Sequence, residues 1–351
     1  MSQRAFRSGV VLLLLLCCLC IVAGCGGEGA AGGVDGATIT FKKTADITEK
    51  WVTAANGNNI YVRLAYPSSS SGTSKYPAVV IVPGGLSGGT TFLDDGLSDL
   101  AERGYIVVTF NPQGRGSGEE GDLTSEGEED FDGYVHQDDL KSVIEDVMQD
   151  PNVDAGSIGV VSYSYGITLA AGCLARHPEL NVKFLIDYEG SSESYTSMGD
   201  PWLLDTVETN DKTKRLYELF GHLSTEMDPS PANVRWWAER QALAYIGSVK
   251  TAYLRIQSQW DHMQPPSVDY RDGFDHPPQW YRNKHAIDMI NAATNGKATW
   301  TRVNEEWIGN AANAVYRNEN PPRYYVDSLD VNSDIFKDIL KNLIEELFAL
   351  P

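Results

Sequence analysis

The sequence predicts an α/β fold, a mostly parallel β-sheet flanked by helices. Two continuous apolar runs, residues 77–89 and 105–118, end in glycines, which is typical of strands buried on both faces of a sheet. Segments with helical spacing follow these runs and alternate with further apolar runs. Such an alternation needs crossover connections, so it favours parallel strands with helices on both faces.

The elements begin with a hairpin. Residues 39–54 and 59–67 flank Asn56-Gly57, a pair typical of a tight turn, so we expect two antiparallel strands there. The later elements are expected in this order: strand 77–89, helix 95–104, strand 105–118, helix 136–150, strand and turn 157–166, helix 167–178, strand 182–190, strand 251–259, helix 283–296, strand 298–304 and helix 333–350.

The alternation breaks after the sixth strand. Residues from about 191 to 250 hold two helical stretches, 211–223 and 233–247, with no strand predicted between them. An insertion at this point would lie over the carboxyl ends of the strands, so we interpret 191–250 as a helical cap. Its tryptophans, Trp236 and Trp237, are expected to pack in the interior of that cap.

The N-terminal segment has the features of a secretory signal. Arg4 and Arg7 precede an apolar run, 10–22, that is too short to span a bilayer comfortably. Residues 22–25, Val-Ala-Gly-Cys, resemble the lipobox of bacterial lipoproteins. The resemblance implies a signal peptide over 1–24, acylation of Cys25 with palmitate-type chains, and anchoring to a membrane of the cell envelope.

The residues after the signal are expected to be a tether. Residues 25–37 are rich in Gly and Ala and lack aromatics, which is typical of a flexible linker, and the folded domain is expected over 38–351. Gly26 stands where an Asp would resemble an inner-membrane retention signal, so we expect the outer membrane rather than the inner one.

Charge and cysteine content exclude several classes of function. The net charge is −20 and becomes −22 once Arg4 and Arg7 leave with the signal, which disfavours binding to nucleic acid or to anionic lipid headgroups. Of the five cysteines, only Cys173 remains as a thiol after processing and acylation, so no disulfide can form within the mature chain. We expect Cys173 to be a small buried packing residue on a helix.

Four motifs occur in a fixed order along the chain. They are Val-Pro-Gly-Gly at 82–85, Gly-Arg-Gly-Ser-Gly at 114–118, Ser-Tyr-Ser-Tyr-Gly at 162–166 and Trp-Asp-His-Met-Gln-Pro-Pro at 260–266. Their order resembles the α/β-hydrolase fold, and in particular its X-Pro dipeptidyl-peptidase, cocaine-esterase and dienelactone-hydrolase-like branches. The resemblance implies a serine hydrolase whose nucleophile lies on a sharp strand-to-helix turn.

The resemblance also assigns roles to individual residues. Ser164 would be the nucleophile, flanked by residues small enough for strand and helix to approach each other. The oxyanion hole would use the main-chain N–H groups of Tyr165 and of Gly85 or Leu86. Asp261 would be the acid of the triad. Asp187, at the end of the sixth strand, is a lesser alternative to Asp261 as the acid.

The histidine of the triad has no counterpart at the usual place. Gly309-Asn310 stands where the family has Gly-His, and an Asn amide has no basic lone pair to accept the serine proton. Two of the six histidines, His276 and His136, are the candidates for a relocated base. Of the other four, His177 is expected to be a helix C-terminal residue and His222 a surface residue of the cap. His262 is expected to be a neighbour of the acid without catalytic use, and His285 an exposed helix residue.

Two acidic features are interpreted as structural. Residues 150–156 begin with the spacing of a calcium loop but lack its bidentate Glu, so we expect an ordinary turn. The acidic run 119–132 is expected to be a solvated loop near the rim of the pocket, where a cation site stays open as an alternative. We expect no cofactor and no catalytic metal.

Two functions therefore remain open. The first is a membrane-anchored serine hydrolase that cleaves an ester, amide or peptide bond through an acyl-enzyme on Ser164, with a small molecule or a peptide as substrate. The alternative is a degenerate α/β-hydrolase-fold lipoprotein that binds a ligand or partner without turnover, because the histidine after the eighth strand is missing.

Overall fold

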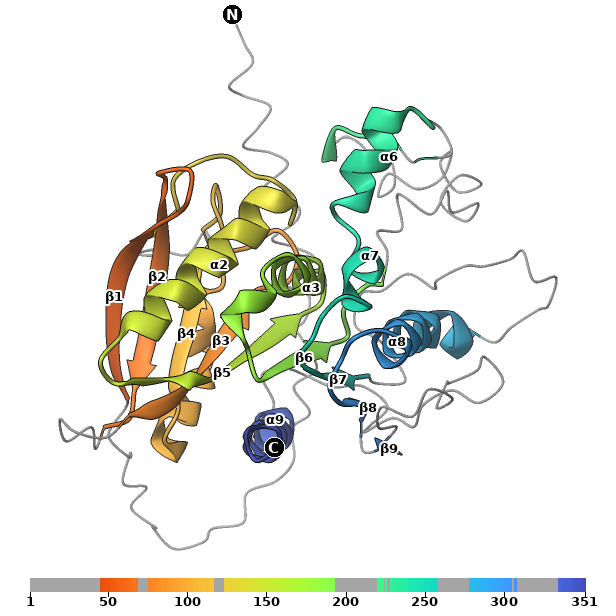
Figure 1. Cartoon of the computed structure of the whole chain (residues 1–351). Coiled ribbons are helices and arrows are strands. Elements are labelled where there is room, and N and C mark those ends of the chain that lie inside the picture. The colour runs from red at the N-terminus through yellow and green to blue at the C-terminus, as the bar shows by residue number, and fades with distance from the viewer. Residues whose placement is uncertain are drawn as a thin grey trace, which may run out of the picture. The chain divides into compact units, whose positions relative to one another are not determined.

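A twisted β-sheet forms the centre of the fold (Figure 1). In this computed structural model the described residues are 45–68, 75–116, 123–192, 220–223, 225, 228–257, 278–304, 306–307 and 334–351, with the side chains of the last two helices described from 285 and from 338. Within them the sheet has nine strands in the order β1-β2-β4-β3-β5-β6-β7-β8-β9. Their bounds are β1 Asp46–Thr53, β2 Asn59–Tyr66, β3 Tyr76–Val82, β4 Ile106–Phe110, β5 Val153–Tyr163, β6 Phe184–Tyr188, β7 Ala252–Ile256, β8 Thr301–Val303 and β9 Glu306–Trp307.

Most neighbouring strands are parallel, as the alternating pattern predicts. The pairs from β4 and β3 through β5, β6 and β7 to β8 are all parallel, whereas β1, β2 and β9 join antiparallel at the two edges. In the sheet β4 comes before β3, the reverse of their order along the chain, so β3 lies beside β5. The carboxyl ends of β3 and β5 therefore meet at one edge of the sheet.

Helices cover both faces of the sheet (Figure 1). Side chains of α2, α3, α7 and α8 share one hydrophobic core with one face of the strands, and those of η1, η2 and α9 share a second core with the other face. Along β3, Val80 belongs to the first core and Val79 to the second, as the alternation of side chains on a strand requires. The helix bounds are η1 Thr90–Leu93, η2 Leu97–Arg103, α2 Tyr134–Gln149, α3 Gly166–Arg176, η3 Pro178–Leu180, α6 Pro231–Ala238, α7 Ala242–Ile246, α8 Pro278–Asn295 and α9 Asp334–Phe348.

The predicted α/β fold with a mostly parallel sheet is confirmed, and individual elements differ in detail. The hairpin forms as expected, with Gly57 at a φ of 91° in the turn. The helix predicted at 95–104 is a seven-residue 3-10 helix, bounded at both ends by glycines with positive φ, Gly96 and Gly104. The edge strand β9 was not predicted, since two residues are too few to show an alternation.

The cap region is described in part. Residues 193–219 lie outside the described residues, so the limits 191–250 stay a prediction. Within that range α7 packs with α3 and α8 in the first core, whereas α6 stands apart from the sheet in Figure 1. Trp237 is fully buried and donates to the carbonyl of Leu223 at 2.7 Å, which places it in the interior of this helical segment.

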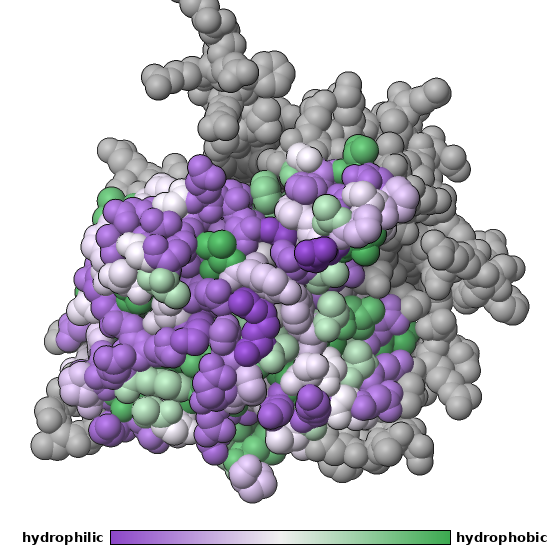
Figure 2. Space-filling model, turned by 45° about the horizontal axis from the view of Figure 1, so that its top comes forward, coloured by the Kyte–Doolittle hydropathy of each residue, from purple (hydrophilic) through white to green (hydrophobic). Residues whose placement is uncertain are grey.

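One face of the described part is largely hydrophilic. Figure 2 shows one face on which hydrophobic residues are scattered among hydrophilic ones. No helix in the described part of the chain combines the length and the apolarity needed to cross a bilayer. The described residues, from 45 onward, belong to one compact unit.

Candidate active site

The turn between β5 and α3 is strained at Ser164. Ser164 has a φ of 51°, a left-handed conformation that costs a residue with a side chain roughly 1–3 kcal/mol. Two main-chain hydrogen bonds hold it there: its N–H donates to Tyr188 O at 2.8 Å and its carbonyl accepts from Ile167 N at 3.2 Å. Ser164 is half-buried although its neighbours Tyr163 and Gly166 are buried. The strand thus turns into the helix within two residues and leaves the serine at the surface of the turn.

Two glycines allow the loop after β3 to lie against this turn. A Cβ at Gly166 would overlap the carbonyl oxygen of Pro83, and a Cβ at Gly84 would lie 2.7 Å from Tyr163 O and 2.9 Å from the Cβ of Ser164. Real Cβ atoms do not approach other atoms so closely, so neither position can carry a side chain without a shift of the backbone. Glycine at 84 and 166 is therefore the condition for contact between the loop and the turn.

The structure brings four of the predicted site residues together. Tyr165 begins the turn into α3, one residue after Ser164, while Gly85 and Leu86 follow the glycine that touches the Ser164 Cβ. Gly85 is exposed with a φ of 60°. The main chain of the loop after β3 and the main chain of the turn therefore lie next to each other at the serine.

Residues after β4 hold the far end of the same loop. The side-chain oxygen of Asn111 accepts hydrogen bonds from the main-chain N–H of Gly89 at 2.8 Å and of Thr90 at 3.2 Å. The main-chain N–H of Gly88 donates to Gly116 O at 3.2 Å. The β3 loop is thus anchored to the β4 loop beyond the stretch that contacts Ser164.

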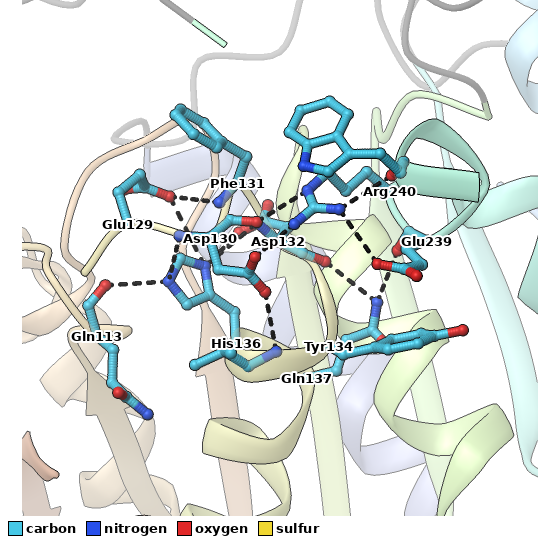
Figure 3. Close-up of polar contacts among 12 residues, drawn as sticks. Gln113, Glu129, Asp130, Phe131, Asp132, Tyr134, His136, Gln137, Glu239 and Arg240 are labelled. Carbon is cyan, nitrogen blue, oxygen red and sulfur yellow. Dashed lines mark hydrogen bonds and ion pairs between the residues drawn. The ribbon is translucent and has the colours of Figure 1, made fainter. Parts of the chain in front are cut away.

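Arg115 connects the β3 loop to a cluster of buried charges, several members of which are shown in Figure 3. Its guanidinium donates to both carboxylate oxygens of Glu129, at 2.8 and 2.6 Å, lies 2.8 Å from Asp132 Oδ1, and donates to Gly85 O at 3.3 Å. The side chains of Arg115 and Asp132 are 1% and 0% exposed. Buried charges of this kind are tolerated because each has a partner of opposite sign.

The pairing sets the protonation of both partners. Burial works against the charge of Arg115, but Asp132 and Glu129 outweigh burial and raise its pKa above the ordinary value. Burial by itself would raise the pKa of Glu129 and so favour its neutral form. The hydrogen bonds and the charge of Arg115 outweigh burial and hold the pKa of Glu129 below the ordinary value. Both groups are therefore charged at neutral pH.

His136, a candidate for the relocated base, lies within this cluster. It is fully buried, with Nε2 3.0 Å from Gln113 O and Nδ1 3.4 Å from Asp132 Oδ1. The main-chain N–H groups of Asp130 and Asp132 also point at its two ring nitrogens (Figure 3). Both nitrogens thus have partners inside the acidic loop, the described part of the run 119–132. Among the described residues no hydrogen bond joins His136 to Ser164.

Three further histidines are described, and each has its own partner. His177 ends α3, as expected, with Nε2 2.9 Å from Asp138 Oδ1. His222 stacks on Trp236 with ring centroids 3.8 Å apart. The expectation that His285 is exposed was wrong: it is 0% exposed, and its Nδ1 lies 2.9 Å from Ser192 Oγ. Its helix packs against the core at this position, which the weak periodicity of that segment did not reveal.

Asp187, the lesser alternative as the acid, lies in a second cluster of buried side chains, where it is hydrogen-bonded. One of its carboxylate oxygens accepts from Tyr253 Oη at 2.7 Å and from Arg255 Nη1 at 2.8 Å, and the other accepts from the N–H of Gly190 at 3.0 Å. Burial and the Asp187 carboxylate raise the pKa of Tyr253 well above its ordinary value. Asp187 therefore has a structural environment that holds the ends of β6 and β7 together.

The remaining predicted site residues lie outside the described residues. These are Asp261, His276 and the lipidation site Cys25, so their roles stay predictions. Cys173 is fully buried on α3, and burial raises the pKa of its thiol, in line with a packing role. Within the described part no cluster of His, Cys, Asp or Glu has the arrangement of a metal site.

The buried charge cluster is the feature that the sequence analysis missed. The acidic run was expected to be solvated. Glu126 and Glu128 are exposed, as expected, but Glu129, Asp130 and Asp132 form ion pairs with arginines. Asp130 pairs with Arg240, which follows α6 and lies 4.0 Å above the Trp236 ring. The sequence carries one signal of this cluster. An arginine in a glycine-rich loop is followed by an acidic loop before the next helix, so opposite charges lie close together in the chain.

Replacing Gly166 by Ala tests the close approach of loop and turn. The added Cβ would overlap Pro83 O, so we expect a loss of about 1–3 kcal/mol in the free energy of unfolding, measured by urea denaturation. Gly156→Ala is the matched control, because its Cβ would lie at an ordinary 3.6 Å from its nearest neighbour, Asp154 Oδ1. Equal stability of the two variants would contradict the proposed contact.

The lowered pKa of Glu129 predicts a pH dependence of stability. A carboxyl group whose folded-state pKa is depressed stabilises the fold above its unfolded pKa, ordinarily 4.5, and the contribution disappears as pH falls through the folded value. The free energy of unfolding of the wild type should therefore fall more steeply below pH 4.5 than that of Glu129→Gln. Glu128→Gln, at an exposed neighbour, should follow the wild type; parallel curves for all three would refute the ion pair's role.

Comparisons with known sequences give short matches. No family model matches the chain. The uncharacterized peptidase YuxL of Bacillus subtilis is 33% identical over 106 residues, which are 29% of this chain and 16% of that protein. Dipeptidyl-peptidase 5 of Porphyromonas gingivalis is 30% identical over 122 residues, 34% of this chain and 17% of that protein. The matched part is thus about a sixth of the length of each of these curated relatives.

Solved structures match most of the chain, between 74% and 90% of it in the three cases below. A puromycin-hydrolyzing peptidase of Mycobacterium tuberculosis has a TM-score of 0.57 at 15% identity, covering 90% of this chain and 41% of its own. Acetyl xylan esterase 1 of Thermoanaerobacterium has a TM-score of 0.55 at 16% identity, covering 88% and 86%. Porphyromonas gingivalis dipeptidyl peptidase 4 has a TM-score of 0.51 at 16% identity, covering 74% and 32%. Together with the strand order and the turn at Ser164, these matches show that the chain has the α/β-hydrolase fold.

Proposed function

We propose that this chain is a serine hydrolase that cleaves an ester, amide or peptide bond through an acyl-enzyme on Ser164. The observation that carries the proposal is the backbone of Ser164, held at a φ of 51° between β5 and α3 and in contact with the glycine loop after β3. The similarity to proteins named as peptidases and as an esterase supports the class of bond.

The proposed chemistry uses the two loops around the serine. Ser164 Oγ attacks the substrate carbonyl, and the negative charge that develops on the carbonyl oxygen is stabilised by the main-chain N–H groups of Tyr165 and of Gly85 or Leu86. A histidine takes the proton of the serine and passes it to the leaving group, so that the bond to that group breaks. Water then attacks the acyl-enzyme and releases the acid.

We propose His276 as this base and Asp261 as the acid that orients it. The alternatives to both residues are engaged elsewhere: His136 has partners at both ring nitrogens within the acidic loop, and Asp187 is paired with Arg255. A base that already bonds elsewhere must give up those bonds before it can accept a proton from serine. Both Asp261 and His276 lie outside the described residues.

A second candidate function is ligand binding without turnover. The observation in its favour is Gly309-Asn310, which stands where related hydrolases carry Gly-His. A serine hydrolase that loses one member of its triad loses several orders of magnitude in turnover, so a chain without a base would keep the pocket and lack the reaction. The two functions differ in whether Ser164 reacts.

Labelling with a fluorophosphonate probe separates them. We expect the wild type to be labelled at neutral pH and Ser164→Ala to be unlabelled. Ser162→Ala is the matched control, because the Ser162 hydroxyl is buried and donates to Ile186 O at 3.2 Å, so the variant should still be labelled. A wild-type protein that is folded but unlabelled would favour the binding function.

The same assay tests the base. His276→Asn should lower the labelling rate by about 10³-fold or more. His177→Asn, at the C-terminal end of α3 beside Asp138, should leave the rate within about twofold, since it touches neither loop of the site. Normal labelling of the His276 variant would exclude this residue as the base.

We propose in addition that the mature protein is anchored through lipid on Cys25 in the cell envelope, in the outer membrane rather than the inner one. The support is the sequence of residues 22–25 and the absence of an Asp at position 26. In a bacterial host, the wild type should enter the detergent phase on phase separation and take up labelled palmitate, and Cys25→Ser should do neither. Equal behaviour of the two proteins would refute the anchor.

A further inference from the structure

Arg115 makes a contact that lies outside the proposed reaction itself. It follows β4, its side chain is 1% exposed, and its Nη1 donates to the main-chain carbonyl of Gly85 at 3.3 Å. Gly85 belongs to the loop that would supply one of the two oxyanion-hole amides. The contact therefore joins a buried charge to the backbone of the candidate site.

The loop needs such a contact because its own sequence leaves it free to rotate. Gly84 and Gly85 are adjacent, Gly85 has a φ of 60°, and a Cβ built at Gly85 would meet no atom within 4 Å. Glycine adopts positive and negative φ with similar ease, so neither sterics nor packing at this residue selects one orientation of the following peptide. The nearest anchors of the loop toward β4 begin at Gly88.

Arg115 is itself held rigidly. Two of its nitrogens form a bidentate pair with Glu129, and Asp132 lies 2.8 Å from one of them. The acidic loop reaches these positions through two successive residues with positive φ, Phe131 at 51° and Asp132 at 62°. Strained backbone at residues other than glycine persists where the surrounding contacts require it, and here the ion pairs supply that requirement.

We propose that Arg115 is a positioning residue that sets the orientation of the Gly85–Leu86 peptide in the oxyanion hole. The peptide group is planar and trans, so its C=O and N–H point in opposite directions. With the Gly85 carbonyl directed at the buried guanidinium, the N–H of Leu86 points away from Arg115. Of the two candidate donors on this side of the hole, Leu86 is the one that Arg115 orients, because the N–H of Gly85 belongs to the preceding peptide. This inference rests on the proposed hydrolase function and adds to it the residue that orients one amide of the oxyanion hole.

Arg115→Lys is the variant that tests this role. Lysine keeps a positive charge beside Glu129 and Asp132 but cannot reproduce the planar fork that bonds Glu129 and Gly85 together. We expect the fluorophosphonate labelling rate of Ser164 to fall by about tenfold or more, since full loss of an oxyanion-hole donor costs roughly 10²–10³-fold. With p-nitrophenyl butyrate, kcat should fall while KM stays within about twofold, because the contact acts on the transition state.

Arg240→Lys is the matched control. Arg240 is 4% exposed and pairs with Asp130 of the same acidic loop, but within the described part of the chain its guanidinium bonds only Asp130, Trp236 and Glu239, none of which belongs to the β3 loop. Its variant should lose a similar amount of stability and keep labelling within about twofold of the wild type. Labelling of Arg115→Lys that is no slower than that of Arg240→Lys would overturn the positioning role.

Hydrogen exchange gives a second readout that does not depend on activity. The amides of residues 84–88 should exchange faster in Arg115→Lys than in the wild type or in Arg240→Lys, because the peptide after Gly85 is then free to rotate. Unchanged exchange would overturn the inference even if labelling slowed. If the wild type is not labelled at all, the hydrolase function fails, and with it the oxyanion role of Leu86, whereas the exchange data still report whether Arg115 holds the loop.

Discussion

The contact between the β3 loop and the turn at Ser164 is the constraint on which the rest of the site depends. It exists because positions 84 and 166 carry no side chain, so that two backbones can approach within the distance that a Cβ would occupy. The parallel pairing of β3 with β5 brings the two segments to the same edge of the sheet. Sheet order therefore determines which loops meet, and the glycines determine how closely they meet.

Two buried arginines stabilise the loops on either side of this contact. Arg115 donates to Gly85 O after β3, and Arg255 donates to Gly190 O after β6. Each is neutralised by a buried aspartate, Asp132 in one case and Asp187 in the other. A buried ion pair adds little net stability compared with apolar packing, but the loss of one partner is costly, so such a pair is a strict way to hold a loop in one position.

The acidic loop also joins the helical segment after β6 to the site. Asp130 pairs with Arg240 close to α6, while Glu129 and Asp132, its neighbours in sequence, pair with Arg115 under the β3 loop. Phe131 lies between them and contacts the Phe220 ring, with centroids 5.0 Å apart, and Phe220 in turn lies 6.3 Å from the Tyr165 ring. The residue next to the serine, the acidic loop and α6 thus form one contiguous set of contacts.

The sequence by itself determined the fold class, the order of strands and helices along the chain, and the position of the turn at Ser164, because these depend on local patterns. Apolar runs, helical spacing and small residues such as Gly166 act over a few residues and can be recognised without knowing the partners. Only the tertiary structure decided that Glu129 and Asp132 are ion-paired rather than solvated, that His136 is enclosed by the acidic loop, and that His285 is buried. Charge pairing and burial depend on residues far apart in the chain, so a local pattern of acidic residues or a lone histidine does not reveal which partner it will meet.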